Sequence, residues 1–180
     1  GVSDFEELHG TNIRAELGLP IDSILIIMAS SILPGKGQLD LIKCISVLSK
    51  EFNNIHLILA GSAVESSKES IQYSEGIKNY VLESNLDNIV HFIGWRYDIR
   101  DIYQSSDIYV STSYSESFPD AVREAMLASL PVVVTDVGGT RELVEIGEYG
   151  YLFEPGDIYN LEEFLKVLIK DDHVRIKMGL

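Results

Sequence analysis

The sequence has 180 residues, of which 46% are hydrophobic, and this size and composition are typical of one domain with a sizeable core. Its 28 acidic residues outnumber 14 lysines and arginines, and the net charge of −14 argues against a nucleic-acid partner, whose phosphates the chain would repel. No apolar run approaches the length of a membrane span, and no basic segment followed by a long apolar stretch indicates a signal peptide.

Cysteine and histidine give no sign of a disulfide or a metal site. Cys44 is the single cysteine, which excludes an intrachain disulfide and fits a reducing compartment, and it shares a helical stripe with Leu41, Ile45 and Leu48, so we expect it in the core. None of the histidines has metal-ligand spacing with another His, Cys or acid, and no Asp-x-Asp pair occurs. We therefore expect no metal held by the protein. The histidines are His9, His56, His91 and His173.

Strands and helices are predicted to alternate after a lead-in. Residues 1–22 have the composition of a linker with one short amphipathic helix, and residues 23–180 form the domain. Continuous apolar runs predict strands at residues 23–30, 54–61, 88–94, 107–112, 131–135 and 149–153. Helical patterns fall between them, at residues 38–52, within 62–86, and at 95–106, 119–130, 138–146 and 158–172.

This alternation predicts an α/β fold, a Rossmann-like three-layer sandwich with a six-stranded parallel sheet and helices on both faces. In such sheets ligands bind beyond the carboxyl ends of the strands, near the point where the strand order reverses. Four loops with candidate residues follow strands, so their agreement favours a ligand site there. They are residues 30–36, 95–97, 113–116 and 136–140.

Two glutamates with seven residues between them mark the most informative stretch, residues 113–140. Glu116 falls in a polar loop, whereas Glu124 lies inside a helix that Pro119 can start, since proline suits the first helical position. Alanines surround Glu124, so we expect its carboxylate to be partly shielded from water and to need a partner. Sugar or ribose hydroxyls are suitable partners, because each donates a hydrogen bond to a charged acceptor.

Lys36 is the cation at the mouth of the helix that follows the first strand. It ends a loop whose turn formers are Pro34, Gly35 and Gly37. There it can add a full charge to the N–H donors of the helix, an arrangement that commonly holds phosphate. An ordinary surface lysine is the alternative that its position alone leaves open.

Two common nucleotide-binding motifs are missing. The segment AGSAVESS after the second strand lacks the Gly-x-Gly-x-x-Gly spacing, and no other strand-to-helix junction has it. The P-loop is also missing, because Gly35-Lys36 is followed by Gly37 rather than Ser or Thr. A nicotinamide enzyme and a P-loop nucleotidase are therefore not expected.

Taken together, the motifs resemble the donor-binding, C-terminal domain of retaining glycosyltransferases of the family-4 group, one half of a GT-B fold. The resemblance runs essentially end to end. It rests on GVSDF, LPGKGQLDLI, HFIGWRYDIRDIY, ESFPDAVREAM, PVVVTDVGGTRELV and GYLFEPGD, in this order.

The resemblance implies roles for individual residues. Glu116 would accept hydrogen bonds from the donor sugar, helped by backbone N–H groups around Ser117 and Phe118, and Glu124 would hold the ribose. Lys36 would neutralise the diphosphate, which in this family needs no bound metal. These residues imply a UDP-, GDP- or ADP-sugar as donor substrate and no further cofactor.

Two glycine-containing turns complete the implied site. The turn formed by Gly94, Arg96 and Tyr97 would hold the nucleobase, largely through backbone groups. Gly138 and Gly139 would let the chain pass close to the ligand.

The sequence departs from the family pattern in the phosphate loop. Ser31 occupies the position where the family often has an arginine, so Ser31 would contact the donor without adding a charge. Arg96 or Arg141 would then be the substitute cation. Asp120 lies in the first turn of the Glu124 helix and is expected to point outward, because it would otherwise repel a phosphate.

The resemblance also implies an activity and partners. The intact enzyme would transfer a hexosyl unit to a glycan or lipid-linked acceptor, in surface polysaccharide or lipopolysaccharide biosynthesis. The acceptor-binding N-terminal half is absent, so this fragment is expected to bind sugar nucleotide and transfer little sugar. We expect a cytoplasmic protein, whose contact with the inner face of a membrane would come through the missing half. The alternatives are a non-catalytic nucleotide-sugar-binding module and a GT-B-type epimerase, although the acid/base cluster an epimerase needs is not evident.

Overall fold

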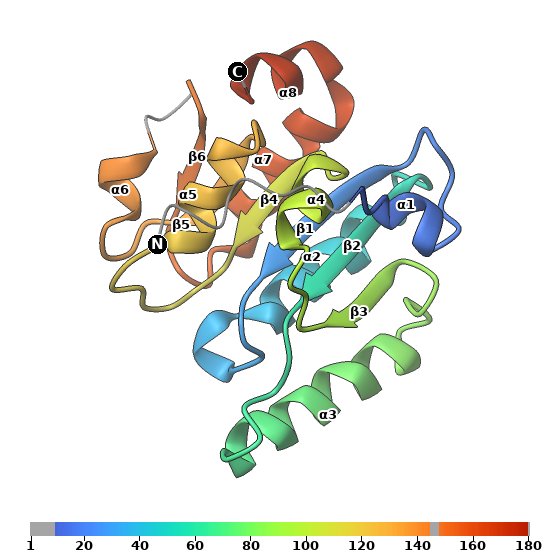
Figure 1. Cartoon of the computed structure of the whole chain (residues 1–180), viewed down its shortest axis with the longest axis vertical. Coiled ribbons are helices and arrows are strands. Elements are labelled where there is room, and N and C mark those ends of the chain that lie inside the picture. Colours follow the sequence, from blue (N-terminus) through green and yellow to red (C-terminus); the bar gives the residue numbers. More distant parts are fainter. Residues whose placement is uncertain (1–9, 145–147, 180) are drawn as a thin grey trace.

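A six-stranded sheet, parallel throughout, forms the centre of the computed structural model, which describes residues 10–144 and 148–179 (Figure 1). The strands and their bounds are as follows: β1 Ile24–Ala29, β2 Ile55–Ala60, β3 Val90–Gly94, β4 Ile108–Ser111, β5 Val132–Thr135 and β6 Gly150–Phe153. This sheet confirms the predicted fold class and each predicted strand.

The strand order is β3-β2-β1-β4-β5-β6, so the chain reverses its direction of travel across the sheet between β1 and β4. Beyond the carboxyl ends of two such neighbouring strands, parallel α/β folds leave a crevice, because the following loops diverge to opposite sides. The loops after β1 and β4 carry Lys36 and Glu116. The topology therefore places these two predicted site residues on either side of the reversal.

Alternating side chains of the strands supply two separate cores. In β1, Ile26 and Met28 face one layer of helices, whereas Leu25 and Ile27 face the other. The first layer is α2 Gln38–Leu48, α3 Lys68–Glu83, α7 Ile158–Lys170 and α8 Asp172–Met178. The second contains α1 Ile13–Glu16, α4 Ile99–Gln104 and α5 Asp120–Leu127, while the shorter η2 Pro34–Lys36 and α6 Thr140–Leu143 lie in loops after β1 and β5.

Several helix bounds differ from the predicted ones. Pro119 is the N-cap of α5 rather than its first residue. The helix expected at residues 158–172 ends at Lys170, and α8 follows because the carboxylate of Asp171 accepts a hydrogen bond from the backbone N–H of Val174 and so starts a new helix. The residues GVSDF and His9 lie outside the described residues.

Cys44 is fully buried in the first core, as predicted. Burial raises the pKa of its thiol to about 12, so the thiolate is not populated near neutral pH.

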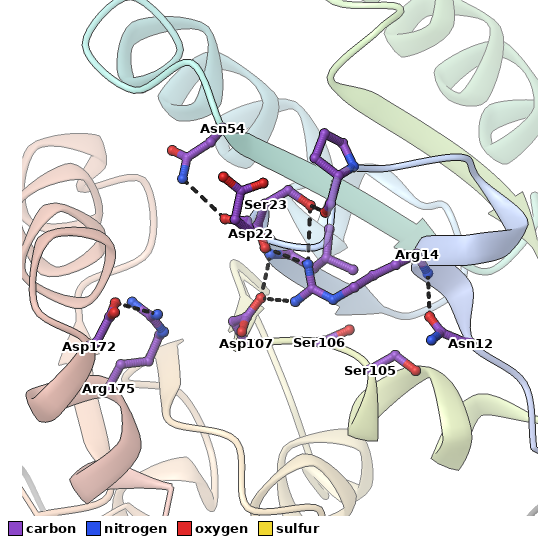
Figure 2. Close-up of polar contacts among 12 residues, drawn as sticks. Asn12, Arg14, Asp22, Ser23, Asn54, Ser105, Ser106, Asp107, Asp172 and Arg175 are labelled. Carbon is purple, nitrogen blue, oxygen red and sulfur yellow. Dashed lines mark hydrogen bonds and ion pairs between the residues drawn. The ribbon is translucent and has the colours of Figure 1, made fainter.

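Residues 10–22, predicted as the end of a linker, pack on the second face of the sheet. Ile13 of α1 is fully buried, and the guanidinium of Arg14 donates to the backbone carbonyl of Ser23 and to the Asp107 carboxylate (2.5 Å; Figure 2). The same oxygen of Asp107 accepts from the backbone N–H of Leu25 at 2.7 Å. Arg14 thus ties α1 to the starts of β1 and β4.

Two histidines on neighbouring strands make the stability of the domain sensitive to pH. His56 Nδ1 and His91 Nε2 lie 3.2 Å apart, a hydrogen bond that needs one nitrogen without a proton. Burial lowers the pKa of both imidazoles below the ordinary value of 6.5. Below that pH the unfolded chain binds more protons than the folded domain, so we expect the free energy of unfolding to fall as the pH drops.

Urea unfolding at about pH 7.5 and about pH 5.5 measures this loss. The double variant His56→Gln/His91→Gln should lose less stability over the same interval than the wild type. An equal loss in both proteins would show that other groups cause the dependence.

Candidate functional site

An ion pair joins the loops on either side of the strand reversal. Lys36 Nζ lies 2.7 Å from Glu116 Oε2, and the two side chains are 25% and 21% exposed. Eighty residues separate the partners in sequence. The structure therefore brings together the predicted phosphate cation and the predicted sugar-binding carboxylate, each part-shielded but reachable by a ligand.

Further hydrogen bonds join these two loops. The hydroxyl of Thr112 donates to the carbonyl of Gly37 (2.8 Å), and the backbone N–H of Tyr114 donates to the carbonyl of Gly35 (2.9 Å). Gly37 has a φ of +70°, and a Cβ there would lie 2.3 Å from the Thr112 carbonyl oxygen. Only glycine allows this close approach of the two loops.

The Gly-Gly turn after β5 packs closely against the Glu116 loop. Gly138 has a φ of +53°, and a Cβ at this position would lie 1.7 Å from the backbone carbonyl oxygen of Glu116. Gly139 is less constrained, since its Cβ would meet only Pro119 Cδ at 3.6 Å. The predicted close passage of the chain is therefore a contact with the Glu116 loop, made at Gly138.

Glu116 and its neighbours line a cavity of about 420 Å³, here called the loop pocket. Ser117, Phe118, Gly138 and Gly139 are thus brought together as the sequence predicts. The ring of Phe118 is exposed, and the guanidinium of Arg123 lies 5.3 Å from its centroid. The lining residues are Glu116, Ser117, Phe118, Pro119, Arg123, Gly138, Gly139, Glu142 and Leu143.

A second cavity of about 440 Å³, here called the strand-end pocket, lies over the ends of β1, β2 and β3. It contains Glu124 and is separated from the loop pocket by the first turn of α5, since Pro119 lines one cavity and Ala121 the other. Its lining residues are Ala29, Ser30, Ser31, Ala60, Gly61, Ser62, Ala63, Val64, Trp95, Arg96, Ile99, Tyr103, Ala121 and Glu124.

Glu124 is half-buried, as the surrounding alanines predict. Burial raises the pKa of its carboxyl, the charge of Asp120 raises it further, and Arg123 opposes both. Within residues 10–144 and 148–179 no hydrogen bond contributes to its pKa, so this carboxylate has acceptor capacity for a ligand. Asp120 points outward as predicted, with a side chain that is 60% exposed and paired with Arg123 at 3.0 Å.

Both arginines suggested as substitutes for the missing cation already have carboxylate partners. Arg96 donates to Asp98 (2.8 and 2.7 Å) and to Glu16 (2.7 and 3.0 Å). Its hydrogen bonds to Asp98 hold the pKa of that carboxyl well below its usual range. Arg141 pairs with Asp136. Lys36 has a carboxylate partner as well, Glu116, but Lys36 lies at the strand reversal itself.

The other predicted residues differ in how closely they approach the strand-end pocket. Ser31 lines it and is exposed, while its carbonyl accepts from Gln38 Nε2 at 2.8 Å. Gly94 ends β3 with a φ of +70°, and its carbonyl accepts from the backbone N–H of Gly61 at 2.7 Å. Tyr97 is 72% exposed and is not among the lining residues, whereas its neighbour Trp95 is.

Sequence reasoning missed Tyr103 and the segment 60–64 as parts of this cavity. The helical spacing of Tyr103 indicates only an apolar contact of its helix, yet the residue lines the strand-end pocket beside Glu124. Tyr103 follows Ile99 by one helical turn, so both side chains lie on the same face of α4. This spacing is a weak sign that the two residues line the same cavity.

The described residues contain no group of three or more His, Cys, Asp and Glu side chains arranged to hold a metal ion. Among the same residues, no helix has both the length and the apolar character required to cross a membrane.

Comparisons with known proteins identify relatives of this chain. Residues 10–179 match the family model of glycosyl transferases group 1. The D-inositol 3-phosphate glycosyltransferase of Corynebacterium efficiens is 29% identical over 170 residues, which are 92% of this chain and 39% of that protein. The UDP-Gal:alpha-D-GlcNAc-diphosphoundecaprenol alpha-1,3-galactosyltransferase of Escherichia coli is 36% identical over 98 residues, 53% of this chain and 24% of the relative.

Among solved structures, Anabaena HepE in complex with UDP-glucose superposes with a TM-score of 0.84 at 28% identity, covering 99% of this chain and 46% of HepE. The chain thus spans less than half the length of each of these three proteins. The match to the family model covers nearly the whole sequence. The chain belongs to the glycosyl transferases group 1 family.

Proposed function

We propose that this chain is the donor-binding half of a retaining glycosyltransferase and that it binds a nucleoside diphosphate sugar. The Lys36–Glu116 pair at the strand reversal carries this proposal, because it places one cation and one hydrogen-bond acceptor where parallel α/β folds bind ligands. The UDP-glucose complex of HepE, a protein of the same fold, supports it.

The two pockets suggest where each part of such a donor binds. The nucleoside would occupy the strand-end pocket, with the ribose hydroxyls donating to Glu124 and the base near the turn from Gly94 to Tyr97. The diphosphate would lie against Lys36, and the sugar hydroxyls would donate to Glu116. Donor binding would therefore break the Lys36–Glu116 ion pair. Lys36 would then contact the diphosphate, and Glu116 would accept hydrogen bonds from the sugar.

The same arrangement favours transfer. Breaking the bond between the sugar and the phosphate leaves negative charge on the diphosphate, and a positioned ammonium stabilises that charge as it develops. Lys36 can supply this stabilisation without a metal ion. No side chain of this half is assigned as a nucleophile.

The acceptor half belongs to the remainder of the full-length protein. A hexosyl unit transferred to a glycan or lipid-linked acceptor is the reaction we propose, in surface polysaccharide assembly. The Escherichia coli galactosyltransferase, whose name specifies a UDP-galactose donor and a diphosphoundecaprenol acceptor, supports this choice. Isolated residues 1–180 should bind donor with little transfer.

Titration calorimetry with UDP-glucose, GDP-mannose and ADP-glucose, and with the bare diphosphates, tests the proposal. Glu124→Ala should weaken sugar nucleotide and bare nucleotide alike by about 1.5–3 kcal/mol, because hydrogen bonds to a charged group are lost from the ribose. Glu116→Ala should weaken only the sugar nucleotides. The exposed Glu75 on α3 offers a matched control, and Glu75→Ala should leave all affinities unchanged.

Two outcomes would contradict this function. Failure of every nucleotide to bind would remove the donor site itself. An equal loss for sugar nucleotides and bare nucleotides in Glu116→Ala would contradict the sugar-binding role of Glu116. A nucleotide-binding module without sugar recognition would show this second pattern.

A further inference from the structure

The hydroxyl of Tyr103 lies in the interior of the domain. The side chain is 1% exposed, and its oxygen makes no hydrogen bond within the part of the chain that the structure describes. The ring packs edge-on against Tyr109, with centroids 5.9 Å apart. Burying a donor in this way destabilises a protein, so an unpaired phenol beside a pocket calls for an explanation.

A candidate acceptor for this hydroxyl belongs to the strand-end pocket. Tyr103 of α4 and Glu124 of α5 both line it, and the two helices lie in the same layer. The carboxylate is close enough for its charge to raise the pKa of Tyr103, after the larger effects of burial and of Tyr109. The pocket therefore holds a donor and an acceptor that are not yet bonded to each other.

We propose that Tyr103 is a positioning residue for Glu124, whose carboxylate accepts the phenol O–H when a nucleotide occupies the strand-end pocket. This inference rests on the proposed function, because it needs a ribose on Glu124. A carboxylate has about four lone-pair sites, enough to accept from Tyr103 and from two ribose hydroxyls together. The bonds of the glutamate side chain rotate freely enough to turn the carboxylate from the cavity toward the phenol.

This arrangement predicts opposite effects on stability and on affinity. In the free protein the phenol donor is unpaired, so its removal has no hydrogen bond to break. In the complex the same donor fixes the carboxylate that holds the ribose, so its removal weakens binding. A tyrosine whose role is only to fill space would leave the affinity unchanged when replaced by phenylalanine.

The variant Tyr103→Phe keeps the ring and deletes the hydroxyl. Its thermal midpoint should equal that of the wild type or exceed it by up to about 2–4 °C. Its Kd should rise about tenfold for whichever of UDP, GDP and ADP binds the wild type most tightly. The rise should be smaller for the 2′-deoxy form of that nucleotide, and it should vanish when Glu124→Ala is already present, because Tyr103 acts through Glu124 on the ribose.

Tyr73→Phe is the matched stability control. The hydroxyl of Tyr73 accepts a hydrogen bond from the backbone N–H of Leu39 at 3.0 Å, so its removal should lower the thermal midpoint. A comparable fall in Tyr103→Phe would show that its hydroxyl has a partner in the free protein and would overturn the inference.

Two binding outcomes would also overturn it: an unchanged Kd, or equal weakening of the nucleotide and its 2′-deoxy form. A wild-type protein that binds none of the three diphosphates would end the proposed function and this inference with it. If the wild type binds a nucleotide and Tyr103→Phe binds it with the same Kd, the role of Tyr103 would be disproved and the proposed function would stand.

Discussion

Gly138→Ala is expected to destabilise the domain by about 3 kcal/mol or more and to remove sugar recognition. A methyl group at this position would lie 1.7 Å from the backbone carbonyl oxygen of Glu116, and the φ of +53° is itself unfavourable for alanine. The Glu116 loop must move to relieve the clash. Thermal unfolding measures the loss of stability, and titration of UDP-glucose against UDP measures the loss of sugar binding.

Two other glycines serve as controls. Gly139→Ala should be nearly neutral, since its Cβ would meet Pro119 only at an ordinary contact distance of 3.6 Å. Gly76 lies inside α3, and nothing lies within 4 Å of the place that an added methyl group would take, so Gly76→Ala should stabilise the domain by about 0.5–1 kcal/mol. If Gly138→Ala were as well tolerated as Gly139→Ala, the support of the Glu116 loop by this turn would be disproved.

Lys36→Met is expected to raise the Kd for UDP about 100-fold. The change removes the cation that would meet the diphosphate. It also leaves the carboxylate of Glu116, which now pairs with Lys36 at 2.7 Å, unpaired beside the phosphates. Both effects oppose an anionic ligand, and calorimetric titration with UDP measures their sum.

The double variant Lys36→Met/Glu116→Gln separates the two effects. It should bind UDP more tightly than Lys36→Met, because the unpaired negative charge is gone, but less tightly than the wild type. Equal Kd values for the single and the double variant would mean that Glu116 does not face the diphosphate. A wild-type Kd in Lys36→Met would exclude Lys36 from the phosphate site.

The architecture was predictable from sequence because each strand is a short apolar run followed by polar turn residues. The runs at 23–30 and 131–135 are apolar on both faces, which only a sheet covered on both sides explains. Periodicity also placed Cys44 in the core, and the alanines around Glu124 indicated its partial burial. These are local properties, and each is decided within a few residues.

Contacts between distant segments were not predictable in the same way. The Lys36–Glu116 pair requires β1 and β4 to be neighbours. The hydrophobic periodicity of a strand does not indicate which strands lie beside it. The ion pair between Arg96 and Glu16 depends on where α1 packs, and Glu16 lies 80 residues before Arg96 in the chain. Tyr103 is a core contact, as its helical spacing predicts, but nothing in that spacing shows that it also lines a cavity.

The packing of α1 defines how much of the chain forms the folding unit. Ile13 fills part of the second core, Arg14 neutralises Asp107, and Thr11 donates a hydrogen bond to the buried Asp98. A protein trimmed to begin at residue 23 would keep all six strands but expose a hydrophobic hollow, and Asp107 and Asp98 would each lose one of their hydrogen-bond donors. The practical boundary of the domain for expression therefore lies upstream of the first strand, at or before residue 10.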